Sequence, residues 1–437
     1  MKSTRLMFSI FLILIFLLTA CDQNNELTNN LPAQAVAEAE TVAETEAEAE
    51  TTANNASTPE AQPTEDDNAQ ESNEESLVES SNDVVRPFSS PEYGMQAFMW
   101  WRPEVADRDL NLLIDAGFNW VKQDFAWREI EGAEKGAFDW SHSDIIVQMA
   151  HDRFGAKIIA RVDRQPSWAT EGECSEGAEM GPPNNFQDYA DFLAAFATRY
   201  KGKIGAYAIW NEPNLAREWC DSPPDPEEYA KLLKLAYSSI KEIDPDTLII
   251  SAGLSPTGGP MPIAMEDTEF LEKLYQIAGG SLDGYADVVG AHAPGFKAPP
   301  EISPDEVMEK TEMYGDGRYF TFRRVEDLRA IMEKYNDTNR QIAILEMGWT
   351  TDPRENSPYN WHAVSEEQKA DYLVRAFAFA EKNWTPWIGL MTVIYLCNTD
   401  WTDEDEQFYW CITHPDYPNT ITYPAYERLK AMPKSLP

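Results

Sequence analysis

Short apolar runs alternate with longer amphipathic stretches along the chain from about residue 90 onward. Eight of these runs have the length and apolar content expected of strands that are buried on both faces. They span residues 93–100, 118–125, 156–162, 204–210, 247–253, 286–292, 341–347 and 388–396. This recurrence predicts eight strands, each separated from the next by a segment of another kind.

The intervening segments carry apolar residues at the three- and four-residue spacing of amphipathic helices. They lie at 104–116, 143–154, 186–200, 226–243, 268–278, 322–335, 365–382 and 424–432. The stretch that begins at Ser365 has Gln368 three residues later, which is the pattern of a capping box at a helix start. A helix is therefore expected after each strand.

Eight strands that alternate with helices predict an α/β protein with a (β/α)8 fold, the TIM barrel. An open doubly wound sheet is the alternative, but no expected strand is followed by a Gly-x-Gly-x-x-Gly turn. We expect a single catalytic domain over residues 87–437. In such a barrel the functional site lies at the C-terminal ends of the strands.

The N-terminus has the layout of an export signal. A basic start precedes an apolar run over residues 6–18, which is short for a membrane-spanning helix. The run ends in Leu-Thr-Ala-Cys, which resembles a bacterial lipobox. We therefore expect a lipoprotein signal peptide over 1–20, lipidation of Cys21, and a cell-surface or periplasmic location. An ordinary signal peptide or a signal anchor with a coincidental cysteine is the alternative.

Residues 21–86 have a different composition from the rest of the chain. Ala, Glu, Thr, Asn and Ser dominate this segment, and aromatic residues are absent. Such a segment buries too little apolar surface to offset the entropy of ordering, which predicts a disordered acidic tether rather than a partner-binding tail. The net charge of −40 argues against nucleic acid as a partner, because the chain would repel phosphates. The membrane is expected to be a partner only through Cys21.

Two of the expected strands end on a glutamate, Glu212 after the fourth and Glu346 in the seventh. Strands four and seven face each other across a barrel mouth, so the two carboxylates can converge. A facing pair of carboxylates is what glycosidic-bond hydrolysis requires, since one must donate a proton while the other is ionised. A surface-loop carboxylate at Glu212 and a purely structural ion pair at Glu346 are the simpler alternatives.

Three stretches resemble the retaining (β/α)8 glycoside hydrolases of the 4/7 superfamily, the clan that includes families 5, 10, 39 and 42. They are WNEPN at 210–214, ILEMGW at 344–349, and DFAWREIEGAEKGAFDWSHSD at 124–144, where Gly132 stands at a position commonly held by proline. The resemblance implies that Glu212 is the acid/base, that Glu346 is the nucleophile and that Asn211 binds the sugar 2-hydroxyl. It also implies β-linked substrates and a reaction that needs no metal or organic cofactor.

Other polar residues near strand ends have open roles. His292, at the end of the sixth strand, either orients the nucleophile or contacts sugar, with a satisfied core histidine as the alternative. Arg161, on the third strand, points either into the barrel or toward the site. Many relatives carry an arginine on strand two, whereas this chain has Lys122, which keeps the charge but loses planar two-pronged hydrogen bonding.

Tryptophans gather at the expected strand ends, where an indole can stack on the apolar face of a sugar ring. The alternative role for each of them is ordinary packing in the core or in a loop. They are Trp100, Trp101, Trp127, Trp168, Trp219, Trp349 and Trp401. We expect substrate contacts from Trp101, Trp349 and Trp401, and the latter two are the leading candidates for sugar platforms.

Four cysteines remain once Cys21 is set aside, an even number that favours disulfides in an exported protein. Their places in neighbouring loops predict two pairs, Cys174–Cys220 and Cys397–Cys411. Their spacing matches no zinc pattern. The acidic loop 400–407 lacks the spaced ligands of a calcium loop and is expected to be solvated.

Other classes of function fit the sequence less well. A barrel metallohydrolase needs clustered histidines, but the chain has only five and no His-x-His. A non-catalytic glycan-binding lipoprotein would have no need of both glutamates, and an adhesion protein would have no need of a two-carboxylate mouth. The expected protein is a monomeric retaining glycoside hydrolase that acts on a carbohydrate substrate.

Overall fold

A computed structural model describes residues 86–100, 102–170, 174 and 180–434. The predicted signal peptide, the lipidation site Cys21, nearly all of the predicted tether and Trp101 lie outside the described residues. Within the described part, no helix is long and apolar enough to cross a membrane.

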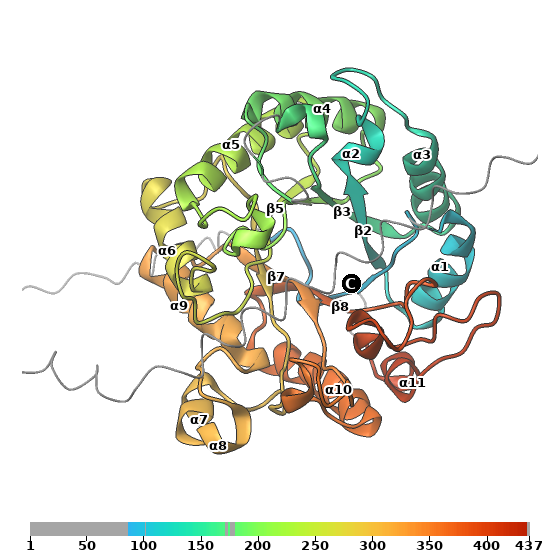
Figure 1. The fold of residues 1–437 in the computed structure, drawn as a ribbon, viewed down its shortest axis with the longest axis vertical. Coiled ribbons are helices and arrows are strands. Elements are labelled where there is room, and N and C mark those ends of the chain that lie inside the picture. The colour runs from blue at the N-terminus through green and yellow to red at the C-terminus, as the bar shows by residue number, and fades with distance from the viewer. Residues whose placement is uncertain (1–85, 101, 171–173, 175–179, 435–437) are drawn as a thin grey trace, which may run out of the picture. The chain divides into compact units, whose positions relative to one another are not determined.

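The strands form one closed parallel barrel in chain order, and this confirms the predicted (β/α)8 fold (Figure 1). They are β1 (Glu92–Gln96), β2 (Trp120–Ala126), β3 (Lys157–Asp163), β4 (Ala206–Ile209), β5 (Leu248–Ser251), β6 (Val288–His292), β7 (Gln341–Met347) and β8 (Ile388–Val393). No strand extends more than one residue beyond either end of its predicted segment.

Helices surround the barrel as a ring (Figure 1). The main ones are α1 (Ala106–Asp115), α3 (Ser141–Val147), α4 (Phe186–Arg199), α5 (Pro226–Ile243), α6 (Asp267–Ile277), α9 (Val325–Lys334), α10 (Glu366–Asn383) and α11 (Pro424–Ala431). The predicted capping box of α10 is present, with Ser365 and Gln368 each bonded to the backbone of the other. The helix predicted at 143–154 is α3 followed by a π-helical segment, Gln148–Arg153.

Three short helices were not expected. They are α2 (Trp127–Ile130), α7 (Pro304–Glu309) and α8 (Thr311–Tyr314), of which α7 and α8 lie outside the ring of longer helices (Figure 1). Their four to six residues are too few to show a helical period in the sequence. The excursion of α7 and α8 lengthens the connection between β6 and β7, which borders the barrel mouth.

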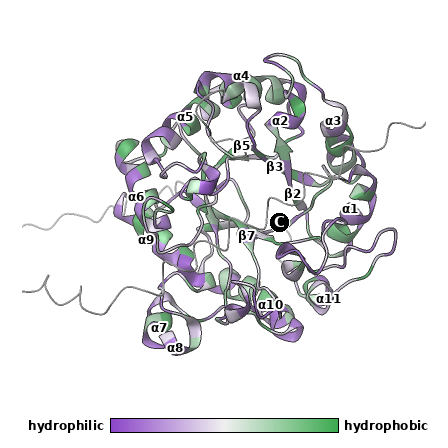
Figure 2. Cartoon of the chain, viewed as in Figure 1, coloured by the Kyte–Doolittle hydropathy of each residue, from purple (hydrophilic) through white to green (hydrophobic). Residues whose placement is uncertain are grey.

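Alternate residues of the strands pack on opposite sides of the barrel wall. Ala206 and Ala208 of β4 belong to the apolar cluster inside the barrel, while Tyr207 and Ile209 belong to the layer between strands and helices. Figure 2 shows the matching pattern on the helices, which have hydrophobic stripes and polar outer faces. With both faces of the wall covered by apolar packing, the strands form a rigid frame for the residues at their ends.

Candidate active site

A cavity of about 550 Å³ opens at the C-terminal ends of the strands. Its walls combine charged residues and aromatic rings, contributed by loops that follow several different strands. They include Gln96, Phe98, Asp124, Arg161, Arg164, Asn211, Glu212, Arg217, Glu218, Ser255, His292, Phe296, Glu346, Tyr359, His362, Tyr395, Trp401, Glu406 and Trp410. Both predicted glutamates therefore line one cavity at the barrel mouth, as the (β/α)8 fold predicted.

Glu212 is held by a sharp change of backbone direction just after β4. Trp210 and Glu212 both have positive φ, 72° and 36°, which non-glycine residues rarely adopt. Trp210 remains in the core with its indole N–H donating to the carbonyl of Glu218, and the Glu212 N–H donates to the carbonyl of Gly253. These anchors hold the unusual backbone in place, as strained backbone at functional sites requires.

Glu346 reaches the cavity through an irregularity in β7. Ile344 and Met347 both pack toward the helices, and the register against β6 and β8 shifts between them. The two residues in between, Leu345 and Glu346, therefore do not alternate, and both face the barrel interior or its mouth. This is the effect of a β-bulge, which re-aims a side chain and is common beside active sites.

His292 lies between the two glutamates. Its Nδ1 atom is 3.0 Å from Glu212 Oε1 and 3.7 Å from Glu346 Oε2, so the two carboxylate oxygens are no farther apart than those distances added together. Gly253 makes room for the ring, because a Cβ at that position would lie 2.3 Å from it. The short separation leaves room for the spacing of about 5 Å that is typical of retaining glycosidases.

Lys122, on β2, forms an ion pair with Glu346. Its fully buried ammonium group donates to Glu346 Oε1 at 2.6 Å and to Gln96 Oε1 at 3.0 Å. Burial favours the neutral form of Glu346, but electrostatic attraction to His292 and Lys122 outweighs this effect and lowers the pKa of this carboxyl. Lys122 thus keeps the carboxylate ionised with one cation, without the two-pronged geometry of an arginine.

Arg161 points toward the site rather than down the barrel. Its guanidinium pairs with Asp124 and Asp163 and lies 3.8 Å from Glu346 Oε1. It also donates to Asn211 Oδ1 at 3.4 Å, which orients the amide of Asn211 beside Glu212. Arg161 and Asn211 therefore both line the cavity, and Arg161 is already committed to several partners.

Arg217 is one of the residues of the site that the sequence did not reveal. Its Nη2 atom donates to Glu212 Oε2 at 2.6 Å, although its side chain is 64% exposed. Burial would raise the pKa of Glu212, but the hydrogen bond from His292 and the charge of Arg217 together hold it well below its usual range. A basic residue five positions after Glu212 was visible in the sequence, but its reach back to the carboxylate was not.

Two further acids line the cavity near Arg217. Burial, reinforced by the charge of Glu212, raises the pKa of Glu218 to about 7, and burial raises the pKa of Glu406 to about 7. Glu406 belongs to the loop that was expected to be solvated, but it folds inward and accepts a hydrogen bond from the Trp410 indole. Within the described ranges, no group of three or more His, Cys, Asp or Glu side chains could hold a metal ion.

The tryptophan predictions had mixed outcomes. Trp401 lines the cavity and packs against Phe98 and Tyr395, so a stacking role for Trp401 stays a prediction. The prediction for Trp349 is wrong: this residue is 0% exposed, and its indole N–H donates to the Ala298 carbonyl at 2.9 Å. Gly295 packs so closely on the Trp349 ring that no sugar could reach it.

The disulfides join the predicted pairs. Cys174 is bonded to Cys220 and links the loops after β3 and β4, and Cys397 is bonded to Cys411 and closes the loop after β8. Both bridges fasten loops on the side of the barrel where the cavity lies, so they restrict the mobility of its walls.

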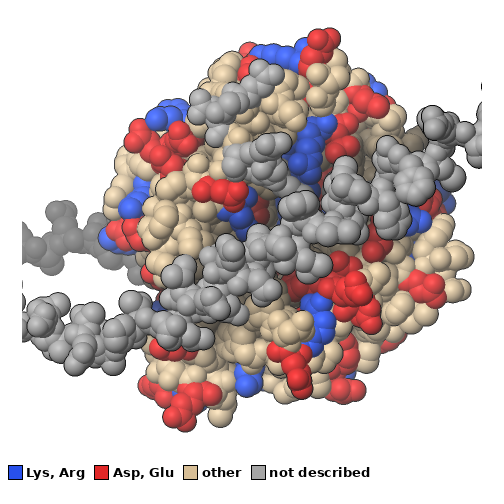
Figure 3. Space-filling view, in the orientation of Figure 1, with Lys and Arg blue, Asp and Glu red and all other residues tan. Residues whose placement is uncertain are grey.

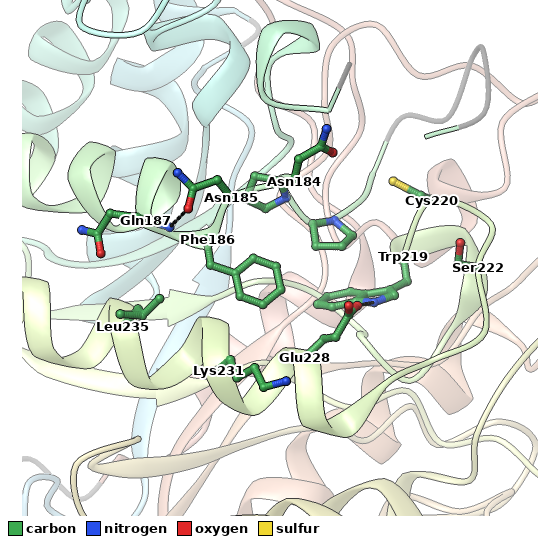
Figure 4. A pocket seen from close by; sticks show the side chains of 12 residues that line it. Asn184, Asn185, Phe186, Gln187, Trp219, Cys220, Ser222, Glu228, Lys231 and Leu235 are labelled. Atoms are coloured by element: carbon green, nitrogen blue, oxygen red, sulfur yellow. Dashed lines mark hydrogen bonds between the residues drawn. The ribbon is translucent and has the colours of Figure 1, made fainter. Parts of the chain in front are cut away.

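A second hollow lies outside the barrel mouth, between α4 and α5. Figure 4 shows Phe186 and Trp219 turned toward each other there, with Glu228 and Lys231 of α5 beside them. Glu228 accepts a hydrogen bond from the Trp219 indole, so its carboxylate already has a structural partner. No facing pair of carboxylates occurs among the residues that line this hollow, in contrast to the barrel mouth.

Comparison with known proteins agrees with this geometry. Residues 79–389 match the family Cellulase (glycosyl hydrolase family 5). Among solved structures, the fold is similar to that of a family 39 glycoside hydrolase from the gut symbiont Bacteroides cellulosilyticus WH2, with a TM-score of 0.56 and 18% identity over 80% of this chain and 64% of the other. It is also similar to a glucosidase from Croceicoccus marinus, with a TM-score of 0.51 and 12% identity over 74% and 62%.

A third similar structure is the β-glycosidase from the hyperthermophile Thermosphaera aggregans. Its TM-score is 0.52 at 14% identity, over 78% of this chain and 95% of the other. The chain spans less than two thirds of the length of the first two structures. At these identities the structural likeness supports the shared barrel fold, while the family match rests on the sequence itself.

Proposed function

Because this chain belongs to the cellulase family, glycosyl hydrolase family 5, we propose that it is a retaining glycoside hydrolase acting on β-linked oligo- or polysaccharides. The observation that carries the proposal is the pair of buried carboxylates, Glu212 and Glu346, facing each other across His292. The same observation disfavours a binding protein without catalysis, because buried charges are costly to keep without a function.

Glu346 is the proposed nucleophile. Lys122 and His292 favour its ionised form, so its carboxylate is ready to attack the anomeric carbon. A bond forms between Glu346 and that carbon while the glycosidic C–O bond breaks, and the leaving oxygen takes a proton from Glu212. Water then attacks the covalent glycosyl-enzyme and gives its proton to Glu212, which releases the sugar and frees Glu346.

Glu212 must be protonated in the first step, but in this structure both of its oxygens are occupied by His292 and Arg217. Arg217 is the exposed partner, so the leaving-group sugar takes its place beside Oε2 when substrate binds. Once this cation has moved away, the proton-bearing form of Glu212 is less strongly disfavoured, because burial is then opposed mainly by the interaction with His292. Arg217 therefore keeps the acid/base ionised until a substrate arrives.

Polar and aromatic residues around the pair orient the sugar. Asn211, fixed by Arg161, is placed to bond the 2-hydroxyl, a contact that strengthens in the transition state. Trp401, which also lines the cavity, supplies the proposed aromatic face for stacking. No residue of this scheme requires a metal or an organic cofactor.

The proposed location is the surface of a bacterial membrane, through lipid on Cys21. The basic start, the apolar run and the lipobox-like ending support this, and the acidic stretch 21–86 would carry the barrel away from the membrane. Figure 3 shows acidic side chains spread over the visible face of the described residues, as suits a protein exposed to solvent.

Metabolic labelling with a fatty-acid analogue checks the anchor: label is expected in the native chain and absent from Cys21→Ala.

Identification of the nucleophile is the main test of the function. Incubation with a panel of 2-deoxy-2-fluoro β-glycosides, followed by peptide mass mapping, should place one sugar on Glu346, because the fluorine slows release of the intermediate. The sugar that labels the enzyme also identifies the substrate class. An active enzyme labelled on another carboxylate would overturn the assignment.

The acid/base assignment predicts a leaving-group dependence. Glu212→Gln should lower kcat by about 10²- to 10⁴-fold for natural β-linked substrates, since the general acid is lost. A 2,4-dinitrophenyl β-glycoside needs little acid help, so its first step should be nearly as fast as in the native enzyme. Glu228→Gln, in the second hollow, is the control. Equal losses on both substrates would contradict the role of Glu212.

The ion pair between Arg217 and Glu212 predicts a change in pH dependence. The alkaline limb of kcat/KM reports loss of the proton from the acid/base of the free enzyme. Arg217→Gln removes a positive charge that favours the ionised form, so the pKa of Glu212 rises and this limb should move to higher pH by about one unit. Arg153→Gln, at an exposed ion pair with Asp107 outside the cavity, serves as the control. An unmoved alkaline limb would show that Arg217 does not govern Glu212.

A further inference from the structure

Trp361 is exposed beside the active-site cavity. Its surface is 43% exposed, and no other tryptophan among the described residues is exposed to this extent. It belongs to the short helical turn Asn360–His362, between Tyr359 and His362, which both line the cavity. A large aromatic residue left in water next to a ligand cavity is a common mark of a binding surface.

A continuous group of rings connects Trp361 to the cavity wall. The centroid of its ring is 4.9 Å from that of His362 and 4.8 Å from that of Phe320. Both of these rings pack on Phe296, at 5.3 Å and 5.0 Å, and Phe296 lines the cavity with His362. We call Phe296, Phe320, Trp361 and His362 the aromatic rim. Trp361 therefore lies one ring beyond the cavity wall.

The rim holds Trp361 in a fixed position although one face of it is in water. Gly315 has a φ of 101°, and a Cβ there would lie 2.7 Å from Phe320 and 2.9 Å from Trp361, so only glycine lets the chain pass so close to both rings. The Asn360 side chain donates to the Asp352 carbonyl, which ties down the turn. Burial lowers the pKa of His362 to about 4, so its ring packs uncharged near neutral pH.

We propose that Trp361 is a sugar-binding subsite outside the cavity, on which a pyranose ring of a polysaccharide stacks while neighbouring sugars of the same chain occupy the cavity. The C–H face of a pyranose fits an indole face, and a ring fixed in advance loses little entropy on binding. The rim is continuous with the cavity, which favours the substrate chain over a separate partner as its occupant. The inference rests on the proposed function and adds to it a substrate class, chains long enough to reach from Glu346 to Trp361.

The test compares long and short substrates. The native enzyme, Trp361→Ala and Trp361→Phe are assayed on the polysaccharide that the native enzyme cleaves, from β-glucan, xylan, mannan and galactan, and on the matching 2,4-dinitrophenyl β-glycoside. The ratio of kcat/KM for the polysaccharide to that for the short glycoside should fall about two- to tenfold in Trp361→Ala. It should fall less in Trp361→Phe, which keeps a ring. Ile277→Ala, which removes another exposed apolar side chain, is the control.

A binding measurement separates this inference from the catalytic one. Affinity electrophoresis in gels that contain each polysaccharide is run with Glu346→Gln, alone and combined with Trp361→Ala, so that no turnover is needed. Retardation should weaken about two- to tenfold in the double variant. Equal retardation, or an equal loss on long and short substrates, would overturn the subsite. Loss of self-association in Trp361→Ala by analytical ultracentrifugation, with unchanged retardation, would instead assign the surface to a second copy.

Discussion

Two carboxylates buried in one mouth repel each other, and the basic side chains that offset this repulsion, two of them cations, determine much of the surrounding structure. Lys122 approaches Glu346 from β2, Arg217 approaches Glu212 from the loop after β4, and His292 lies between the pair. Each group sits on a different element, so the charge balance depends on the closed barrel that brings these elements together. The two cations differ in burial: Lys122 is enclosed, whereas Arg217 is open to solvent. This difference matches the different demands on a nucleophile and on an acid.

Much of the fold could be predicted from sequence, because strands covered on both faces leave continuous apolar runs and the helices between them leave a helical period. The positions of Glu212 and Glu346 followed from the same pattern, since residues at or just beyond the C-terminal ends of barrel strands lie at the mouth. The short helices α7 and α8 could not be predicted, since one or two turns show no period.

Most side-chain contacts between distant segments of the chain could not be predicted from the sequence. Trp349 and Trp401 both follow barrel strands, yet Trp349 is enclosed by Gly295 and the Ala298 carbonyl, while Trp401 faces the cavity. That outcome depends on a loop some 50 residues away, which a local pattern does not describe. The roles of Arg217 and Glu406 could not be predicted for the same reason, because their contacts depend on how exposed loops fold over the mouth.

Because of the bulge in β7, the position of the nucleophile depends on the number of residues in the strand as well as on the residue type. With the N-terminal part of β7 held in register, removal of Leu345 would restore regular alternation and leave the glutamate facing the barrel interior, but in the place of Leu345, within the apolar cluster rather than at the mouth. Two homologues could then carry a glutamate in the same alignment column and differ in whether it reaches the sugar. In barrels of this kind, the insertion or loss of one residue inside a strand can therefore turn an enzyme into a binding protein, although the glutamate is still present in its sequence.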